Sequence, residues 1–158
     1  KITVSTSGIA NKIKEAADEI GTYLALSLHA PNDELREKIM PINRKFKINE
    51  LVKQLKYYTS VVKEPIFLEY VMLKGINDTE ECAKQLVKLM SKFPSKVNLI
   101  EFNSWPGVKF QPTERQEIEK FSKFIKDKGY MSFIRRSRGD DVLAACGQLR
   151  TESEKKNI

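Results

Sequence analysis

Apolar stretches with strand character alternate along this chain with segments of helical periodicity, and this alternation limits the folds open to it. Strands are predicted at residues 2–5, 23–28, 66–73, 97–103 and 130–134. Apolar residues at helical spacing predict helices between them, over about 10–20, 33–40, 51–62, 82–93 and 114–128. Such alternation is typical of parallel strands joined by right-handed helical crossovers. Five strand–helix steps are too few for a complete barrel of about eight strands, so the pattern fits either a doubly wound sheet or half of a barrel.

Local signals place the starts of several helices. Asn32 or Asp33 is expected to cap the second helix. Residues 75–78 are predicted to form a turn that supplies the capping residue of the fourth helix. Thr113 and Gln116 have the spacing of a capping box ahead of the last helix.

The chain is expected to form one domain. We assign residues 1–150 to this domain and residues 151–158 to a polar tail that frays. The sequence has no initial methionine and enters directly into a strand-like run. The expectation is therefore a fragment of something longer.

Composition narrows the classes of protein further. With 41% hydrophobic and 31% charged residues, no apolar run long enough to span a membrane and no signal peptide, the chain is expected to be cytoplasmic and without a membrane partner. Two cysteines and one histidine argue against a disulfide framework and against a metal site within this chain. The net charge of +7 favours phosphate-rich partners such as nucleic acid.

The two cysteines differ in their surroundings. Cys82 lies on an apolar helical stripe and is expected in the core. Cys146 stands among small residues shortly after Arg135, Arg136 and Arg138, where cationic charge favours the reactive thiolate. A free cysteine is also a common buried hydrophobe, so the local sequence leaves both roles open for Cys146.

Polar side chains follow the predicted strands. Because parallel strands bring their carboxyl ends to one edge, these residues are expected to converge on a single rim. Each also has an ordinary structural role as a turn former or capping residue. A Gly-rich phosphate loop and a Gly-x-Ser-x-Gly elbow are both missing from the sequence, which disfavours a nucleotide-binding fold and a serine hydrolase. The rim residues are Ser5 and Ser7, Ser27 and His29, Glu69 or the turn at 75–77, Asn103, and Arg135, Arg136 and Arg138.

In a series of short segments, from Val-Ser-Thr-Ser-Gly at 4–8 to Ala-Ala-Cys-Gly-Gln-Leu at 144–149, the sequence resembles the RlmN family, radical S-adenosylmethionine (SAM) enzymes that methylate carbon 2 of adenine in 23S ribosomal RNA and in tRNA. The matching segments follow one another in family order across almost the whole chain. A sister family that methylates carbon 8 shares the Ala-Cys-Gly-Gln-Leu ending but lacks the segments at 29–33 and 138–141, which therefore favour carbon 2. The segments are Val-Ser-Thr-Ser-Gly at 4–8, Ser-Leu-His-Ala-Pro-Asn-Asp at 27–33, Met-Pro-Ile-Asn at 40–43, residues 69–73 and 77–78, residues 98–100, 103 and 106–107, Arg-Gly-Asp-Asp at 138–141 and Ala-Ala-Cys-Gly-Gln-Leu at 144–149.

The resemblance implies a fold and a set of site residues. The fold is the C-terminal half of a radical-SAM partial (β/α) barrel with a C-terminal strand and loop extension. Cys146 is implied to be the methylated cysteine, which takes a methyl group from one SAM. A second SAM, cleaved at a 4Fe–4S cluster with an electron from an external donor, would generate the radical that passes this carbon to adenine. A second cysteine would then resolve the adduct as a disulfide. The implied SAM contacts are Ser5, Ser27, Leu28, His29 and Asn103.

The sequence also departs from the family pattern. The Cys-x-x-x-Cys-x-x-Cys cluster motif, the Gly-Glu SAM motif, the resolving cysteine and the N-terminal accessory domain are missing from this sequence. The expectation is a monomer that is inactive alone but belongs to a working 23S rRNA and tRNA methyltransferase. Three other functions stay open: a carbon-8 adenine rRNA methyltransferase of the sister family, a non-catalytic RNA-binding domain, and an unrelated barrel enzyme for phosphorylated metabolites.

Overall fold

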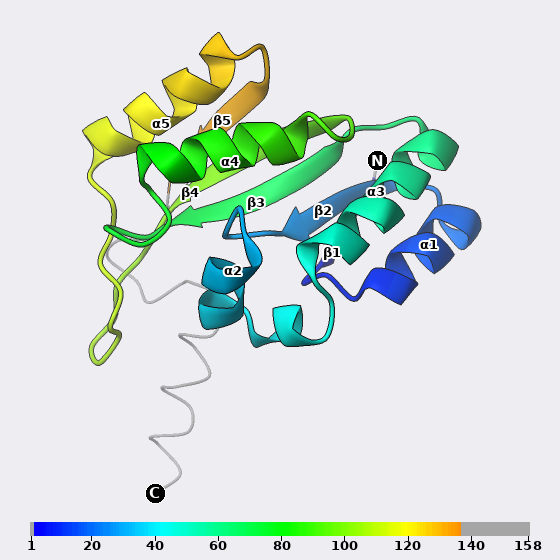
Figure 1. Cartoon of the computed structure of the whole chain (residues 1–158), viewed down its shortest axis with the longest axis horizontal. Helices are drawn as coiled ribbons and strands as arrows, with labels where there is room; N and C mark the ends of the chain where they lie inside the picture. The colour runs from blue at the N-terminus through cyan, green and yellow to red at the C-terminus, as the bar shows by residue number, and fades with distance from the viewer. Residues whose placement is uncertain (1, 137–158) are drawn as a thin grey trace, which may run out of the picture.

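The computed structural model describes residues 2–136 and shows strands and helices alternating in the predicted order (Figure 1). The strands are β1 (Thr3–Thr6), β2 (Tyr23–Ser27), β3 (Ile66–Met72), β4 (Ser95–Glu101) and β5 (Met131–Arg135). The helices are α1 (Ala10–Glu19), α2 (Asp33–Ile39), α3 (Ile48–Val62), α4 (Glu80–Met90) and α5 (Arg115–Asp127), with a 3₁₀ turn, η1, at Pro41–Arg44. The predicted boundary at residues 150 and 151 lies outside the described residues.

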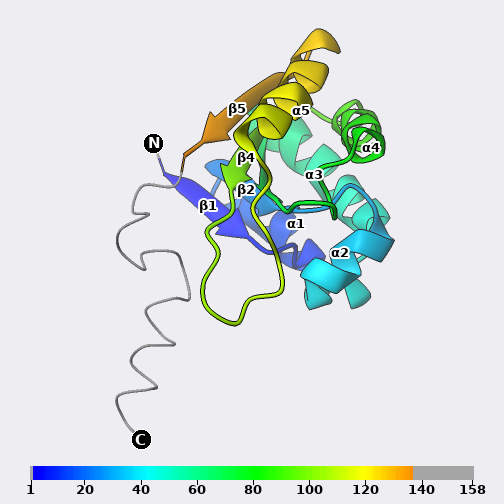
Figure 2. The same cartoon turned by 90° about the vertical axis from the view of Figure 1, so that its left-hand side faces the viewer.

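The five strands form one parallel sheet in the order β1-β2-β3-β4-β5. Each strand therefore pairs with the next one in the sequence, and the order does not reverse. The helices lie together on one side of the sheet in both views (Figures 1 and 2). A doubly wound sheet would reverse its order and carry helices on both faces. Consecutive order with helices on one side is the arrangement of a barrel wall, so the half-barrel prediction is confirmed.

The sheet has two different faces because successive side chains of a strand point to opposite sides. On β3, alternate residues from Ile66 to Met72 are fully buried against the helices. Phe67, Glu69 and Val71 lie between them on the other face and are only half-buried. We call this second surface the open face. The face that packs against the helices therefore carries the apolar residues that stabilise the fold. The open face is available for polar side chains.

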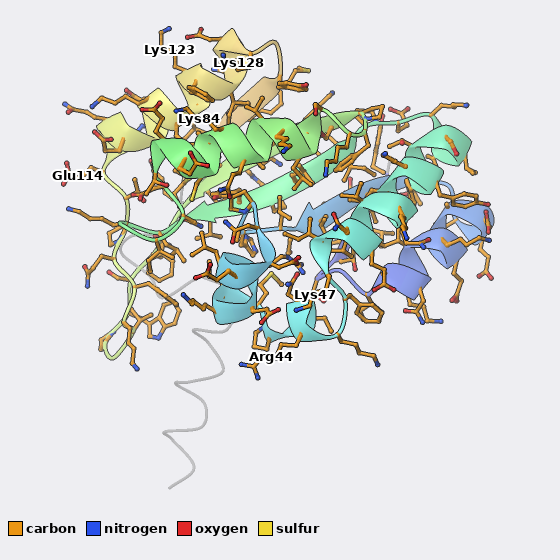
Figure 3. All side chains as sticks on the ribbon, viewed as in Figure 1. Arg44, Lys47, Lys84, Glu114, Lys123 and Lys128 are labelled. Carbon is orange, nitrogen blue, oxygen red and sulfur yellow. The ribbon has the colours of Figure 1, made fainter. Side chains whose placement is uncertain are left out.

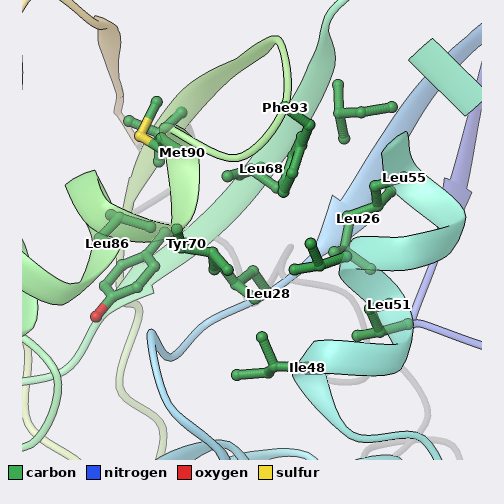
Figure 4. Close-up of a cluster of buried hydrophobic side chains, with 14 of the residues drawn as sticks. Leu26, Leu28, Ile48, Leu51, Leu55, Leu68, Tyr70, Leu86, Met90 and Phe93 are labelled. Atoms are coloured by element: carbon green, nitrogen blue, oxygen red, sulfur yellow. The ribbon is translucent and has the colours of Figure 1, made fainter. Parts of the chain in front are cut away.

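The core lies between the helices and the sheet. Figure 4 shows Leu26 and Leu28 of the β2 region packing with Leu51 and Leu55 of α3, and Leu68 and Tyr70 of β3 beside Leu86 and Met90 of α4. The long amphipathic helices bury one apolar stripe each, as their periodicity predicts. Cys82 is 4% exposed on the buried side of α4, which confirms the prediction that it belongs to the core.

Helix capping was predicted correctly at one helix and wrongly at two. Asn32 caps α2, and its side-chain oxygen accepts a hydrogen bond from the Leu35 N–H at 2.9 Å. The capping residue of α4 is Thr79, one position beyond the predicted turn.

The predicted capping box at Thr113 does not form. Glu114 precedes α5 without a side-chain cap. The Thr113 hydroxyl instead donates to the Asp78 carboxylate at 2.9 Å, so a tertiary partner takes the group that the local pattern assigned to the helix.

A core truncation tests the packing. Leu68→Ala is expected to lower the free energy of unfolding by about 2–5 kcal/mol, because Leu68 is fully buried at the centre of the sheet. Val61→Ala on α3, where Val61 is 44% exposed, is the matched control and should change stability by less than about 0.5 kcal/mol. Urea denaturation followed by circular dichroism measures both values. Equal losses in the two variants would contradict the assignment of Leu68 to the core.

Candidate functional site

The first two strands place two predicted hydroxyls on the open face near the carboxyl rim. Ser5 pairs in register with Ala25, and Ser27 is two residues beyond Ala25 on the same strand, so both serines project to one side of the sheet. Ser5 is exposed, and Ser27 is half-buried at the end of β2. The sheet register therefore brings these two predicted residues together.

Leu28 lies differently from its neighbours. Its side chain is 1% exposed and belongs to the core on the helix side. Its N–H donates to the Glu69 carbonyl at 3.0 Å, and its carbonyl accepts from Arg36 Nε at 3.1 Å. The side chain and both backbone groups of Leu28 are thus engaged within the protein.

His29 follows β2 in a left-handed conformation with φ of 57°. Its Nδ1 accepts a hydrogen bond from the Val71 N–H at 3.1 Å, and its carbonyl accepts from Asn77 Nδ2 at 2.8 Å. Burial, with a smaller contribution from the nearby Arg36 charge, lowers the pKa of His29 to about 4. The imidazole is therefore neutral near pH 7, and because Nδ1 accepts, the ring proton resides on Nε2. His29 can offer a ligand a hydrogen-bond donor.

A buried arginine that the sequence analysis missed holds this rim together. The Arg36 side chain is 0% exposed. Its guanidinium donates to the carbonyls of Ser7 at 2.7 Å, Ser27 at 3.0 Å and Leu28 at 3.1 Å, and to Asn43 Oδ1 at 3.0 Å. One side chain thus joins the loop after β1 to the end of β2.

The buried arginine sits in a fitted and electrostatically balanced environment. A Cβ on Gly8, whose φ is +103°, would lie 2.9 Å from Arg36 Nη2, so only glycine fits there. Asn43 bonds Asp33 at 2.8 Å, and the same Asp33 carboxylate accepts from the Ile48 N–H at 2.9 Å. Burial lowers the pKa of Arg36 to about 10 while the Asp33 charge raises it, so the guanidinium stays charged at neutral pH.

Asn77 is the corresponding buried group between β2 and β3. It is 0% exposed, and its Nδ2 donates to the carbonyls of His29 at 2.8 Å and Val71 at 2.7 Å. Its Oδ1 accepts from the Leu73 N–H at 2.7 Å, and its carbonyl accepts from the Tyr70 hydroxyl at 2.6 Å. Asn77, which the sequence analysis placed in a turn and among the candidate rim residues, therefore fixes the backbone that carries His29.

Charged side chains occupy the centre of the open face. Glu69 pairs in register with Ser27 on one side and Asn98 on the other. Asn98 Nδ2 donates to Glu69 Oε1 at 2.8 Å. Arg135 Nη1 lies 3.7 Å from Glu69 Oε2, which is an ion pair rather than a hydrogen bond. These side chains continue the polar surface that begins at Ser5 and Ser27.

Asn103 follows β4 and is half-buried at the start of a long loop. An aromatic cluster lies in this loop, with the Phe102 ring centroid 5.6 Å from that of Trp105 and 6.3 Å from that of Phe110. Asn103 therefore lies next in sequence to Phe102, in the same loop as this aromatic cluster. Cys146 and Arg138 lie outside the described residues.

Several lysines on and near the helices form ion pairs with acidic side chains, and Figure 3 labels Lys84, Lys123 and Glu114 among the charged residues of this surface. Lys84 pairs with Glu80, Lys123 with Asp127 on α5, and Lys74 with Glu114. Such exposed pairs are weak, but each one carries no net charge. Lys74, Lys84 and Lys123 therefore add little net positive charge to this surface.

Residues 2–136 contain no group of three or more His, Cys, Asp or Glu side chains that could hold a metal ion. Within the same residues, no helix is long and apolar enough to cross a membrane.

Known proteins similar to this chain were found among curated sequences and among solved structures. No family model matches the chain. The curated protein "Dual-specificity RNA methyltransferase RlmN" of Gluconobacter oxydans is 49% identical over 157 residues, which cover 99% of this chain and 39% of that relative. The protein of the same name from Brucella anthropi is 51% identical over 156 residues, covering 98% of this chain and 38% of the relative. Nearly the whole chain is therefore similar to one portion of these RlmN proteins. It spans about two fifths of the length of the curated relatives it matches.

Solved structures support the same assignment of the fold. A radical SAM methyltransferase from Sphaerobacter thermophilus superposes with a TM-score of 0.89 at 38% identity, over 93% of this chain and 43% of that one. SuiB of Streptococcus suis, solved with S-adenosylmethionine, has a TM-score of 0.62 at 15% identity and shares the fold. The predicted half of a radical-SAM partial barrel is thus confirmed, and the RlmN-family coverage agrees with the expected C-terminal portion.

The Arg36 network can be tested by a conservative change. Arg36→Lys is expected to lower the free energy of unfolding by about 2–4 kcal/mol, because an ammonium cannot span three carbonyls and leaves buried acceptors without donors. Arg115→Lys is the matched control, since Arg115 is partly exposed and bonds only carboxylates, and should cost less than about 1 kcal/mol. Chemical denaturation compares them. If the Arg36→Lys and Arg115→Lys proteins were equally stable, the predicted contribution of the Arg36 hydrogen bonds to stability would be wrong.

The lowered pKa of His29 predicts an acid-sensitive stability. Unfolding returns the pKa to its ordinary value of 6.5, so below that pH the unfolded state binds a proton that the folded state binds only near pH 4. The stabilisation is complete above pH 6.5 and is lost as the pH falls, by about 2 kcal/mol at pH 5.

The matched variant is His29→Asn, since asparagine tolerates a positive φ and its Oδ1 can accept from the Val71 N–H. Stability measured from pH 7.5 to pH 5 should fall less steeply in this variant, because His29 is the single histidine of the chain. Parallel curves for the two proteins would exclude His29 as the titrating group.

Proposed function

We propose that the whole protein to which this chain belongs is an RNA methyltransferase that uses S-adenosylmethionine and methylates carbon 2 of an adenine in 23S rRNA and in tRNA. The observation that carries the proposal is identity of 47–51% to proteins named dual-specificity RNA methyltransferase RlmN over nearly all of this chain. The polar rim and open face, built on the same fold as a radical SAM methyltransferase, support it.

The rim supplies groups that suit SAM, which carries hydroxyl, amino and carboxylate groups. Ser5 and Ser27 offer hydroxyls on one face, and His29 offers the Nε2 proton of a neutral ring. Asn103 adds a carboxamide beyond β4. Leu28, with its side chain in the core, sets the spacing between Ser27 and His29. Arg36 and Asn77 position these groups through the backbone.

Cys146 is the proposed methyl carrier. A ring carbon of adenine is too weak a nucleophile to displace a methyl group from a sulfonium, whereas a thiolate can. After the thiol loses its proton to solvent, the sulfur of Cys146 attacks the methyl carbon. A new S–C bond forms as the sulfonium S–C bond breaks, and its electron pair leaves with S-adenosylhomocysteine. The arginines that precede Cys146 in the sequence would favour the thiolate that this step requires.

The proposed 4Fe–4S cluster does not fit the residues of this chain. Cys82 is buried in the core between α4 and the sheet, which leaves Cys146 as the one other cysteine in the sequence. A cluster usually takes several cysteine thiolates as ligands. Its ligands, the resolving cysteine and the site for an external electron donor are therefore assigned to the rest of the protein. We accordingly expect no methyl transfer from this chain alone.

Replacement of the proposed carrier tests the function. In the whole protein, Cys146→Ala should reduce transfer of a radiolabelled methyl group from SAM to 23S rRNA fragments and tRNA by at least about a thousandfold, because the nucleophile is removed. Nucleoside analysis by mass spectrometry identifies 2-methyladenosine as the expected product and separates it from the carbon-8 product of the sister family.

Cys82→Ala is the matched control. It removes the other thiol, which is 4% exposed in the core, and should cost about 1 kcal/mol of stability while methyl transfer continues. Full activity of the Cys146→Ala protein would refute the carrier role. RNA binding without methylation by the wild-type whole protein would favour a non-catalytic domain instead.

A further inference from the structure

Glu69 is a carboxylate placed near the middle of the sheet, where its chemistry requires an explanation. It lies on β3 on the open face, and its side chain is 16% exposed. In the register of the sheet it stands between Ser27 on β2 and Asn98 on β4, and Phe133 of β5 follows Asn98. The carboxylate is therefore a direct neighbour of a proposed SAM contact.

The two oxygens of Glu69 are treated differently by the protein. Oε1 accepts from Asn98 Nδ2 at 2.8 Å. Oε2 is buried, and the structure of residues 2–136 gives it no hydrogen-bond partner. Arg135 Nη1 is 3.7 Å away, beyond hydrogen-bond range, and the Arg135 side chain is 63% exposed. An ionised carboxylate accepts about four hydrogen bonds, and a buried acceptor without a donor is costly. Oε2 can therefore accept a hydrogen bond from a ligand that brings a donor to the open face.

The position and charge of Glu69 favour SAM over RNA as the source of that hydrogen-bond donor. Neighbouring strands are about 4.8 Å apart, so a molecule that touches Ser27 also lies within reach of Glu69. A carboxylate repels the phosphates of RNA, whereas SAM carries a net positive charge, ribose hydroxyls and amino groups. Asn98 fixes the orientation of the carboxylate, and Arg135 offsets part of its charge.

We propose that Glu69 Oε2 accepts a hydrogen bond from a ribose hydroxyl or amino group of bound S-adenosylmethionine, which makes Glu69 a further binding residue of the rim. This inference rests on the proposed function, because it takes SAM as the molecule bound at Ser27.

The test is Glu69→Gln in the whole protein, with SAM affinity measured by isothermal titration calorimetry. Glutamine keeps an oxygen for Asn98 Nδ2 but replaces Oε2 with an amide that cannot accept. The dissociation constant of SAM should rise on the order of 10- to 100-fold, the effect of losing a hydrogen bond to a charged group.

Glu101→Gln is the matched control. Glu101 stands at the end of the neighbouring strand β4, two residues past Leu99 of the core, and its carboxylate bonds Arg115 at 2.7 Å on the helix side. It undergoes the same chemical change on the opposite side of the sheet. SAM affinity should stay within about twofold of wild type in this variant.

Two further readouts separate binding from structure. Wild type should bind one of the 2′-deoxy, 3′-deoxy or N6,N6-dimethyl analogues of SAM more weakly than SAM, and Glu69→Gln should show no additional loss for that analogue, because the two changes remove one contact. The ligand-free Glu69→Gln protein should melt at or above the wild-type temperature, since an amide costs less to bury than a carboxylate.

Three results of these titrations would contradict the proposal. SAM affinity within about twofold of wild type in Glu69→Gln, equal losses in Glu69→Gln and Glu101→Gln, or a loss confined to RNA affinity would each overturn the proposal. Failure of the wild-type whole protein to bind SAM would instead refute the proposed function. The two failures are therefore distinguishable in one series of titrations.

Discussion

The rim of this half barrel depends on one interaction, the burial of a guanidinium among backbone carbonyls. Arg36 has no carboxylate within hydrogen-bond distance in the part of the chain that the structure describes, and it satisfies its charge with the carbonyls of Ser7, Ser27 and Leu28 and with Asn43. A buried charge is stable only when such donors and acceptors are closely matched. Arg36 therefore holds the loop after β1 and the end of β2 at a fixed separation. This in turn fixes the spacing between the side chains of Ser5, Ser27 and His29.

The two faces of the sheet have different roles: one packs against the helices and stabilises the fold, and the other carries the polar residues of the candidate site. Along β3, Leu68 and Tyr70 bind the helix layer, while Glu69 between them faces the open side. The same alternation on β2 sends Leu26 to the core and Ser27 to the open face. Polar residues can thus collect on one face without weakening the apolar contacts that hold the fold, because each strand uses alternate positions for the two purposes.

The sequence predicted what depends on local periodicity and on topology. Strand and helix order, the Asn32 cap and the burial of Cys82 follow from residues near one another in the chain. The convergence of Ser5 and Ser27 follows from parallel pairing. Arg36 lies on a short helix with charged neighbours, where no local pattern marks it as buried, and its bond to Ser7 crosses 29 positions. The error at Thr113 has the same origin, since Asp78 is 35 residues away. The placement of Leu28 was readable in principle, because it alternates with Ser27. What sequence periodicity misses are single polar side chains whose partners arrive from distant segments.

The distance of these partners along the chain also orders events in folding. Arg36 can give up its water only after both the loop after β1 and the end of β2 have reached it, and Asn77 meets His29 across 48 positions. The guanidinium keeps its hydration until those segments arrive, because a charge that is buried without partners is costly. The polar groups that shape the rim are therefore in place only when the segments from β1 to β3 have come together, so the rim assembles with the sheet rather than before it.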